Sequence, residues 1–66
     1  MKTIILMHRE NSVDEIQTVD LDVLPSCGAK IQVNDPKDGY TDAIVEEIAW
    51  DCVAEPPRVE ITVRKK

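Results

Sequence analysis

The clearest signal in this chain is a strict alternation of apolar and polar residues over positions 18–23, which read TVDLDV. Val19, Leu21 and Val23 fall on one side, and the threonine and the two aspartates fall on the other. Successive side chains of a β-strand point to opposite faces of a sheet. The alternation therefore predicts a strand with one buried face and one solvated, acidic face.

Three further stretches have strand patterns. Residues 29–34, AKIQVN, and residues 58–64, RVEITVR, alternate in the same way, and residues 4–7, IILM, form an apolar run that suits a strand covered on both faces. The intervening segments 24–28, LPSCG, and 35–39, DPKDG, contain proline and glycine and predict turns.

Residues 41–53 fit two predictions. Ile44, Ile48 and Cys52 recur at every fourth position, which suits a helix. At a period of two, Ile44, Ile48, Trp50 and Cys52 share a strand face that only Glu46 interrupts, and a bulge at the adjacent glutamates 46 and 47 would restore the register. We favour the strand, because a hairpin-type turn precedes it and an alternating stretch follows it.

Short strands separated by turns predict an all-β fold, a small five-stranded antiparallel barrel or sandwich over residues 1–64, with residues 65–66 as a basic C-terminal tail. Closure of the sheet would remove its exposed edges. The alternative is an α+β domain with residues 41–53 as one helix on a four-stranded sheet. A chain of this length buries a small core, so we expect no large internal cavity and a function carried by the surface.

A resemblance supports the barrel. Leu-Pro is followed by a glycine and an alternating strand, then by a Pro/Gly turn, Tyr40, Ile-Ala-Trp-Asp and Pro-Pro-Arg-Val-Glu-Ile-Thr-Val. This order of features, within residues 18–64, resembles a loose group of small phage and mobile-element proteins with a Src-homology-3-like barrel. The resemblance implies no activity, and it implies an accessory protein that acts by binding other proteins.

The charge of the chain is acidic, with 13 aspartates and glutamates against 8 lysines and arginines and a net charge of -5. A body of this sign repels a phosphate backbone, so general nucleic-acid binding is disfavoured. Weak binding through the basic C-terminal end, at Arg58, Arg64, Lys65 and Lys66, is the alternative. The apolar run at residues 4–7 is too short for a signal peptide or a membrane span, and we expect a cytoplasmic protein.

Metal and cofactor sites are not expected. Cys27, Cys52 and His8 are the only soft ligands and none is paired with another in sequence, so reduced, buried cysteines are the preferred interpretation. The turn at residues 34–39 is not a calcium loop, because Pro36 occupies a position that needs an oxygen ligand.

Catalysis is not expected either. Neither cysteine has a histidine nearby in sequence to activate it. Glu46 and Glu47 are adjacent, so on a strand they point to opposite faces and do not form a catalytic pair. Trp50 is interpreted as a filler of the core, with Trp50 and Tyr40 as exposed contact residues in the alternative.

The function that these patterns favour is a small acidic, non-enzymatic protein-binding module whose carboxylates meet a basic protein surface. Its sharper form is a phage-type inhibitor or modulator of a host nucleic-acid-handling protein. The alternatives are acids that only keep the domain soluble, and a self-assembling structural protein, a homo-oligomer that buries its first or last strand. The candidate partner-binding residues are Asp20, Asp22, Glu46, Glu47 and Asp51.

Overall fold

The computed structural model describes residues 1–66 and contains five β-strands and no helix. The strands are β1 (Lys2–His8), β2 (Val13–Asp20), β3 (Lys30–Asp35), β4 (Gly39–Asp51) and β5 (Arg58–Lys65). The all-β prediction is confirmed, and the alternative with a helix over residues 41–53 is wrong, because β4 occupies nearly all of that stretch. No helix of the length and apolar character needed to cross a membrane is present.

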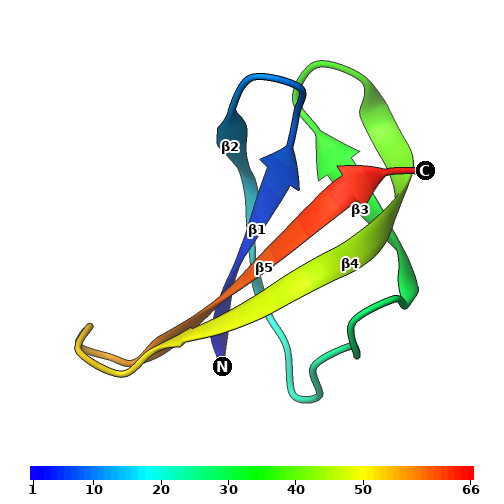
Figure 1. The fold of residues 1–66 in the computed structure, drawn as a ribbon. Coiled ribbons are helices and arrows are strands. Elements are labelled where there is room, and N and C mark those ends of the chain that lie inside the picture. The colour runs from blue at the N-terminus through cyan, green and yellow to red at the C-terminus, as the bar shows by residue number, and fades with distance from the viewer.

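The strands form one sheet in the order β2-β1-β5-β4-β3, which curls into a half-barrel (Figure 1). β1 pairs with β2, β4 with β5 and β3 with β4 in antiparallel ladders, but β1 and β5 are parallel. The prediction that all strands are antiparallel is therefore wrong. The reason is geometric: five consecutive strands that alternate in direction bring the first and the last side by side pointing the same way.

The core lies on the concave face of the half-barrel. The alternation predicted for residues 58–64 is confirmed, because Val59, Ile61 and Val63 are each 0% exposed. The run in β1 is covered on both faces as predicted, since the neighbours Ile4 and Ile5 are both buried. The remaining members of the core cluster are Met7, Val33, Ala43 and Val45.

The strand predicted over residues 18–23 ends early. β2 stops at Asp20, where the Leu21 N–H donates to the Met1 carbonyl at 3.1 Å, and Val23 is 82% exposed. Leu21 and Leu24 both pack against the core, although they lie three positions apart. A strand with a period of two cannot turn both inward, so the chain leaves the sheet to bury them.

The bulge predicted within β4 is confirmed, since the register with β5 shifts between Val45 and Glu47. The predicted face is correct only beyond the bulge, where Ile48 packs against the core. Before it, Ala43 and Val45 are the buried residues, and Ile44 is half-buried on the opposite face.

Three expected core side chains are exposed instead. Trp50 is 58% exposed, and Cys27 and Cys52 are exposed free thiols. Pairing between β3 and β4 ends at Ile44, so the second half of β4, with Trp50 on it, has β5 as its only bonded neighbour. Too few elements remain there to cover a large ring.

Candidate functional site

β2 and β3 are the two edges of the sheet, and a gap separates them along the open side of the half-barrel (Figure 1). No ladder joins these strands. Their one recorded hydrogen bond is made by a side chain: the backbone N–H of Asn34 donates to Gln17 Oε1 at 3.1 Å. The closure predicted from sequence is thus incomplete, and the first and last strands lie inside the sheet rather than at its edges.

A charged clasp links the turn after β1 to the end of β3. Arg9 Nε donates to Asp14 Oδ2 at 2.6 Å, and Arg9 Nη2 donates to Asp35 Oδ1 at 3.0 Å. The Asp35 side chain is fully buried, and the Lys37 N–H donates to Asp35 Oδ1 at 2.9 Å. The hydrogen bonds from Arg9 and Lys37 hold the pKa of Asp35 below its ordinary value, and those with Asp35 and Asp14 raise the pKa of Arg9.

Below the clasp the gap widens into an apolar groove of about 380 Å³. Its side chains come from β2, β3, the segment between them, and strands β1 and β5. The groove is open to solvent, so it is a feature of the surface rather than an enclosed cavity. It is lined by Ile5, Gln17, Val19, Leu21, Val23, Leu24, Pro25, Ile31, Gln32, Val33 and Ile61, eight of which are hydrophobic.

Backbone groups at the rim of the groove lack partners. In an antiparallel pair, alternate residues direct both N–H and C=O away from the neighbouring strand. Because the Asn34 N–H points toward β2, the same alternation turns the backbone groups of Gln32 and Lys30 toward the gap. The Leu21 N–H donates to the Met1 carbonyl, on the side of β1. By the same alternation, Asp20 and Thr18 of β2 direct their backbone N–H and C=O groups away from β1 and toward the gap.

The predicted partner-binding acids do not gather on one surface. Asp20 pairs with the N-terminal amine, and Glu46 accepts a hydrogen bond from His8 Nδ1 at 3.0 Å and lies 3.5 Å from Arg64 Nε. Asp22 and Glu47 are exposed and belong to no ion pair, so they are the two predicted acids that remain free to meet another molecule.

Asp51 has a local structural role. Its Oδ1 accepts hydrogen bonds from the backbone N–H groups of Val53 and Ala54, both at 3.1 Å, and its Oδ2 lies 3.3 Å from Arg58 Nε. The bond from Ala54, followed by that from Val53 and the charge of Arg58, lowers the pKa of Asp51. Asp51 therefore fixes the turn between β4 and β5.

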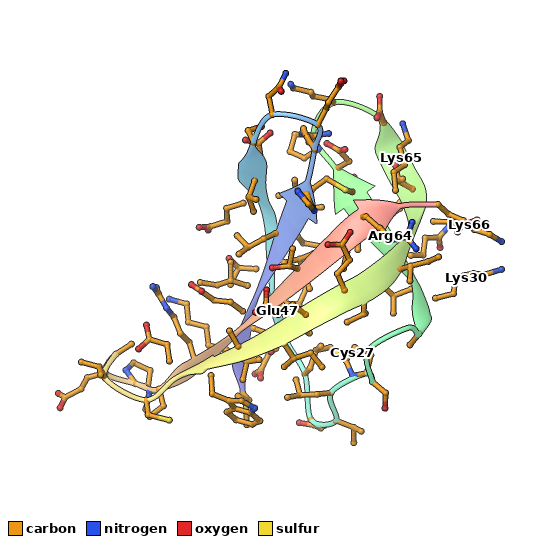
Figure 2. The ribbon with its side chains drawn as sticks, in the orientation of Figure 1. Cys27, Lys30, Glu47, Arg64, Lys65 and Lys66 are labelled. Carbon is orange, nitrogen blue, oxygen red and sulfur yellow. The ribbon has the colours of Figure 1, made fainter.

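The basic residues are divided between the two ends of β5. Figure 2 shows Arg64, Lys65 and Lys66 at its C-terminal end. Lys30 of β3, which the sequence does not single out, and Arg64 lie on either side of Ile44 of β4 in the strand registers. Lys65, assigned by sequence to a tail, is the last residue of β5, and its Nζ donates to Asp38 Oδ2 at 2.7 Å. Arg58, at the other end of the strand, is about 20 Å away by strand rise.

No three histidine, cysteine or acidic side chains are arranged to hold a metal ion. Tyr40 and Trp50 lie near opposite ends of the 13-residue strand β4, so the exposed aromatic residues form no shared surface.

The groove is the feature that the sequence prediction missed. The one signal of the groove in the sequence was Gln17, a polar residue on the same face of β2 as Val19, which points toward the core. The chain matches no protein-family model, and no curated protein and no solved structure matches it.

Proposed function

We propose that this chain is a small protein-binding module that anchors apolar side chains of a partner in the groove between β2 and β3. The groove carries the proposal. It is open, mostly aliphatic and about 380 Å³ in volume, which lies within the usual range of binding pockets. An exposed apolar surface on a small domain is costly to keep uncovered and is typical of interaction sites.

The acidic rim gives the partner its expected character. Asp22 lies between the groove-lining residues Leu21 and Val23, and Asp20 precedes them at the end of β2. Acids beside an apolar anchor site favour a partner with basic residues next to its apolar ones, because complementary charge speeds association and selects among partners. Glu47, on the other face, would extend this attraction without touching the groove.

The identity of the partner remains a prediction. The resemblance to small phage-type proteins with a Src-homology-3-like barrel favours a host nucleic-acid-handling protein whose basic surface the acids occupy. Competition between this chain and duplex DNA for the partner would test that form of the proposal. Partner binding that DNA does not reduce would contradict it.

A matched pair of substitutions tests the groove. Val23 is 82% exposed and lines the groove, and Val53 is 91% exposed in the turn between β4 and β5. Val23→Asp and Val53→Asp make the same chemical change at sites whose exposure predicts little effect on folding. We expect Val23→Asp to weaken partner binding at least about tenfold and Val53→Asp to leave it unchanged.

The measurement is capture of proteins from cells of the source organism on immobilised wild-type chain and on the two variants. The supporting result is a protein that wild type and Val53→Asp retain and Val23→Asp loses. A captured protein retained equally by all three would place the contact elsewhere, and the absence of any specific protein would contradict the proposed function.

Nucleic-acid binding through the basic end is a second candidate, favoured by the placement of Lys30 and Arg64 on either side of Ile44. Neighbouring carboxylates oppose it, since Glu46 pairs with Arg64 and Asp38 with Lys65. If it is correct, single-stranded DNA should bind with a marked salt dependence that Lys30→Ala reduces. A salt-independent interaction, or none, would exclude this candidate.

A further inference from the structure

We propose that the edge of β3 facing the gap accepts an extended segment of the partner as an added β-strand, with aliphatic side chains in the groove and basic side chains beside the acids of β2. This inference rests on the proposed protein-binding function and specifies how the partner is held. Its basis is the combination of unpaired backbone groups, an apolar floor and a charged rim at one place.

The backbone supplies the first part of the case. By the alternation along β3, Lys30 and Gln32 direct their N–H and C=O groups into the gap, where no ladder joins β3 to β2. An unpaired sheet edge is a template for another strand. Added-strand recognition uses these main-chain bonds for affinity and the pockets beside the edge for specificity.

The groove supplies the second part. A strand bonded to β3 at Gln32 would turn alternate side chains toward the concave side, above Ile5 and Ile61. Those positions require aliphatic side chains, because the surfaces that they would meet are methyl groups. A partner segment with an apolar residue at every second position fits this spacing.

The outer face supplies the third part. The intervening side chains of the added strand would point outward, toward the outer side chains of β2 across the gap. On β2 the outward acid without an ion pair is Glu15, and Asp22 follows the strand; Asp20 is 84% exposed at its side chain but already pairs with the N-terminal amine. Opposite charges on neighbouring strands are stabilising, so the intervening residues that face the acids of β2 should be lysine or arginine, whereas the position beside the outward Lys30 of β3 should be uncharged. The occupant is therefore a strand of alternating aliphatic and basic residues.

Room for the strand requires the gap to widen at its upper end. The side chain of Gln17 spans the space to Asn34, so β2 and β3 stand farther apart than a directly bonded pair. A strand that pairs with β3 would replace that bond by one from its own carbonyl to the Asn34 N–H. The clasp between Arg9 and Asp35 lies at the end of the gap and can remain closed.

The probe is a capped synthetic peptide of alternating lysine and valine, titrated into isotope-labelled protein and followed by amide NMR and hydrogen exchange. We expect shift changes at Lys30, Gln32 and the groove methyl groups, and slower exchange of the Gln32 amide by roughly tenfold at saturation. The same peptide with alternate N-methylated backbone amides, or with glutamate in place of lysine, should not bind.

Proline substitution removes the edge donor from the protein. Gln32→Pro deletes an N–H that faces the gap and leaves the bonds to β4 in place, as is tolerated on edge strands. We expect it to weaken peptide binding about fivefold to tenfold relative to Gln32→Ala, which also lacks the groove-lining glutamine side chain but keeps the N–H, so that the difference between the two variants is the effect of one backbone hydrogen bond. If the proline variant fails to fold, the N-methylated peptide tests the same bond on the wild-type chain.

Three outcomes would overturn the inference. The first is peptide binding that shifts only Glu47 and its neighbours on the outer face, without slowing exchange at the edge. The second is protection of the edge amides at rising protein concentration without peptide, which would make a second copy of the chain the occupant. The third is no binding of the peptide. The capture experiment with Val23→Asp is independent of all three, so it reports separately on the proposed function.

Discussion

The junction of β1 with β5 and the gap between β2 and β3 are both places where two strands of one curled sheet meet, and only the first is bonded. The bonded pair is parallel, which is the slightly weaker arrangement per residue. The unbonded pair runs in the antiparallel sense that favours pairing. Backbone preference alone therefore predicts the reverse of what is found.

Side chains explain the difference. At the junction, Ile5 and Met7 of β1 lie beside Ile61 and Val63 of β5, and each of these residues is buried. β2 places Gln17 and Asp14 among its inward positions and has a bulge where its register with β1 shifts. Burial of aliphatic surface holds two strands together, and a strand edge with polar inward residues gains too little from closing the barrel.

Amide hydrogen exchange should show the largest difference between these regions. The Ile61 amide lies in the central strand and should exchange only on global unfolding, whose free energy is roughly 3–10 kcal/mol for a domain of this length. The Gln32 amide faces the gap and should exchange nearly as fast as in an unfolded chain. Comparable protection of both amides would mean that β2 and β3 close onto each other in solution.

Paired truncations should show the next largest difference. Ile61→Ala removes a side chain that is 0% exposed and should lower the free energy of unfolding by about 2–4 kcal/mol. Ile31→Ala removes a half-buried wall of the groove and should cost about half as much, because no complete cavity forms. Urea denaturation followed by circular dichroism measures both values, and equal losses would show that the groove wall is packed as tightly as the junction.

The clasp at the upper end of the gap gives a smaller, pH-dependent effect. Since the folded-state pKa of Asp35 lies below its ordinary value of 3.8, its contribution is fully present above about pH 4 and is lost as the pH falls below that value. Asp35→Asn should flatten the loss of stability in acid. The substituted amide keeps the shape of the side chain and can still accept from Arg9 and Lys37, so the loss at neutral pH should be below that of Ile61→Ala.

Asp51→Asn is the matched control for the clasp, because hydrogen bonds lower the pKa of Asp51 with the same sign at the turn between β4 and β5. Both variants should lose part of the acid dependence. Only Asp35→Asn should speed amide exchange near Asn34, since only the clasp borders the gap. An Asp35→Asn variant with the acid dependence of wild type would show that the clasp does not contribute to the loss of stability in acid.

The sequence predicts those features of the fold that follow from the spacing of apolar residues along single strands. β5 follows from strict alternation, β1 from a continuous apolar run, and the bulge in β4 from the two adjacent glutamates. The parallel junction has no signature in any one strand, because it follows from how the whole ring is arranged. The groove is equally hidden, since it depends on where Leu21 and Leu24 leave the sheet.

The surroundings of the predicted site residues are hidden from the sequence for a related reason. Composition identifies acids but does not show which cations lie beside them, and Glu46 meets His8 and Arg64 only through pairing across three strands. Asp51 looks like a surface charge in sequence and is held by the turn that follows it. Glu47 stays free because Thr62 rather than a cation lies opposite it, which only the register of β4 with β5 reveals.

The smallest predicted effect concerns Trp50. Outside the gap, this residue shows the clearest disagreement between the sequence interpretation, which placed it in the core, and the structure, which exposes it. A tryptophan that filled the core would cost about 3–5 kcal/mol on truncation to alanine. Trp50 is 58% exposed and lies on the half of β4 that does not pair with β3. Trp50→Ala should therefore lower the free energy of unfolding by about 1 kcal/mol or less. Urea denaturation measures this value, and quenching of the single tryptophan by iodide in the native state gives an independent check. A large loss of stability, or fluorescence shielded from iodide, would mean that the end of β4 folds onto the groove and that the open side is narrower than described.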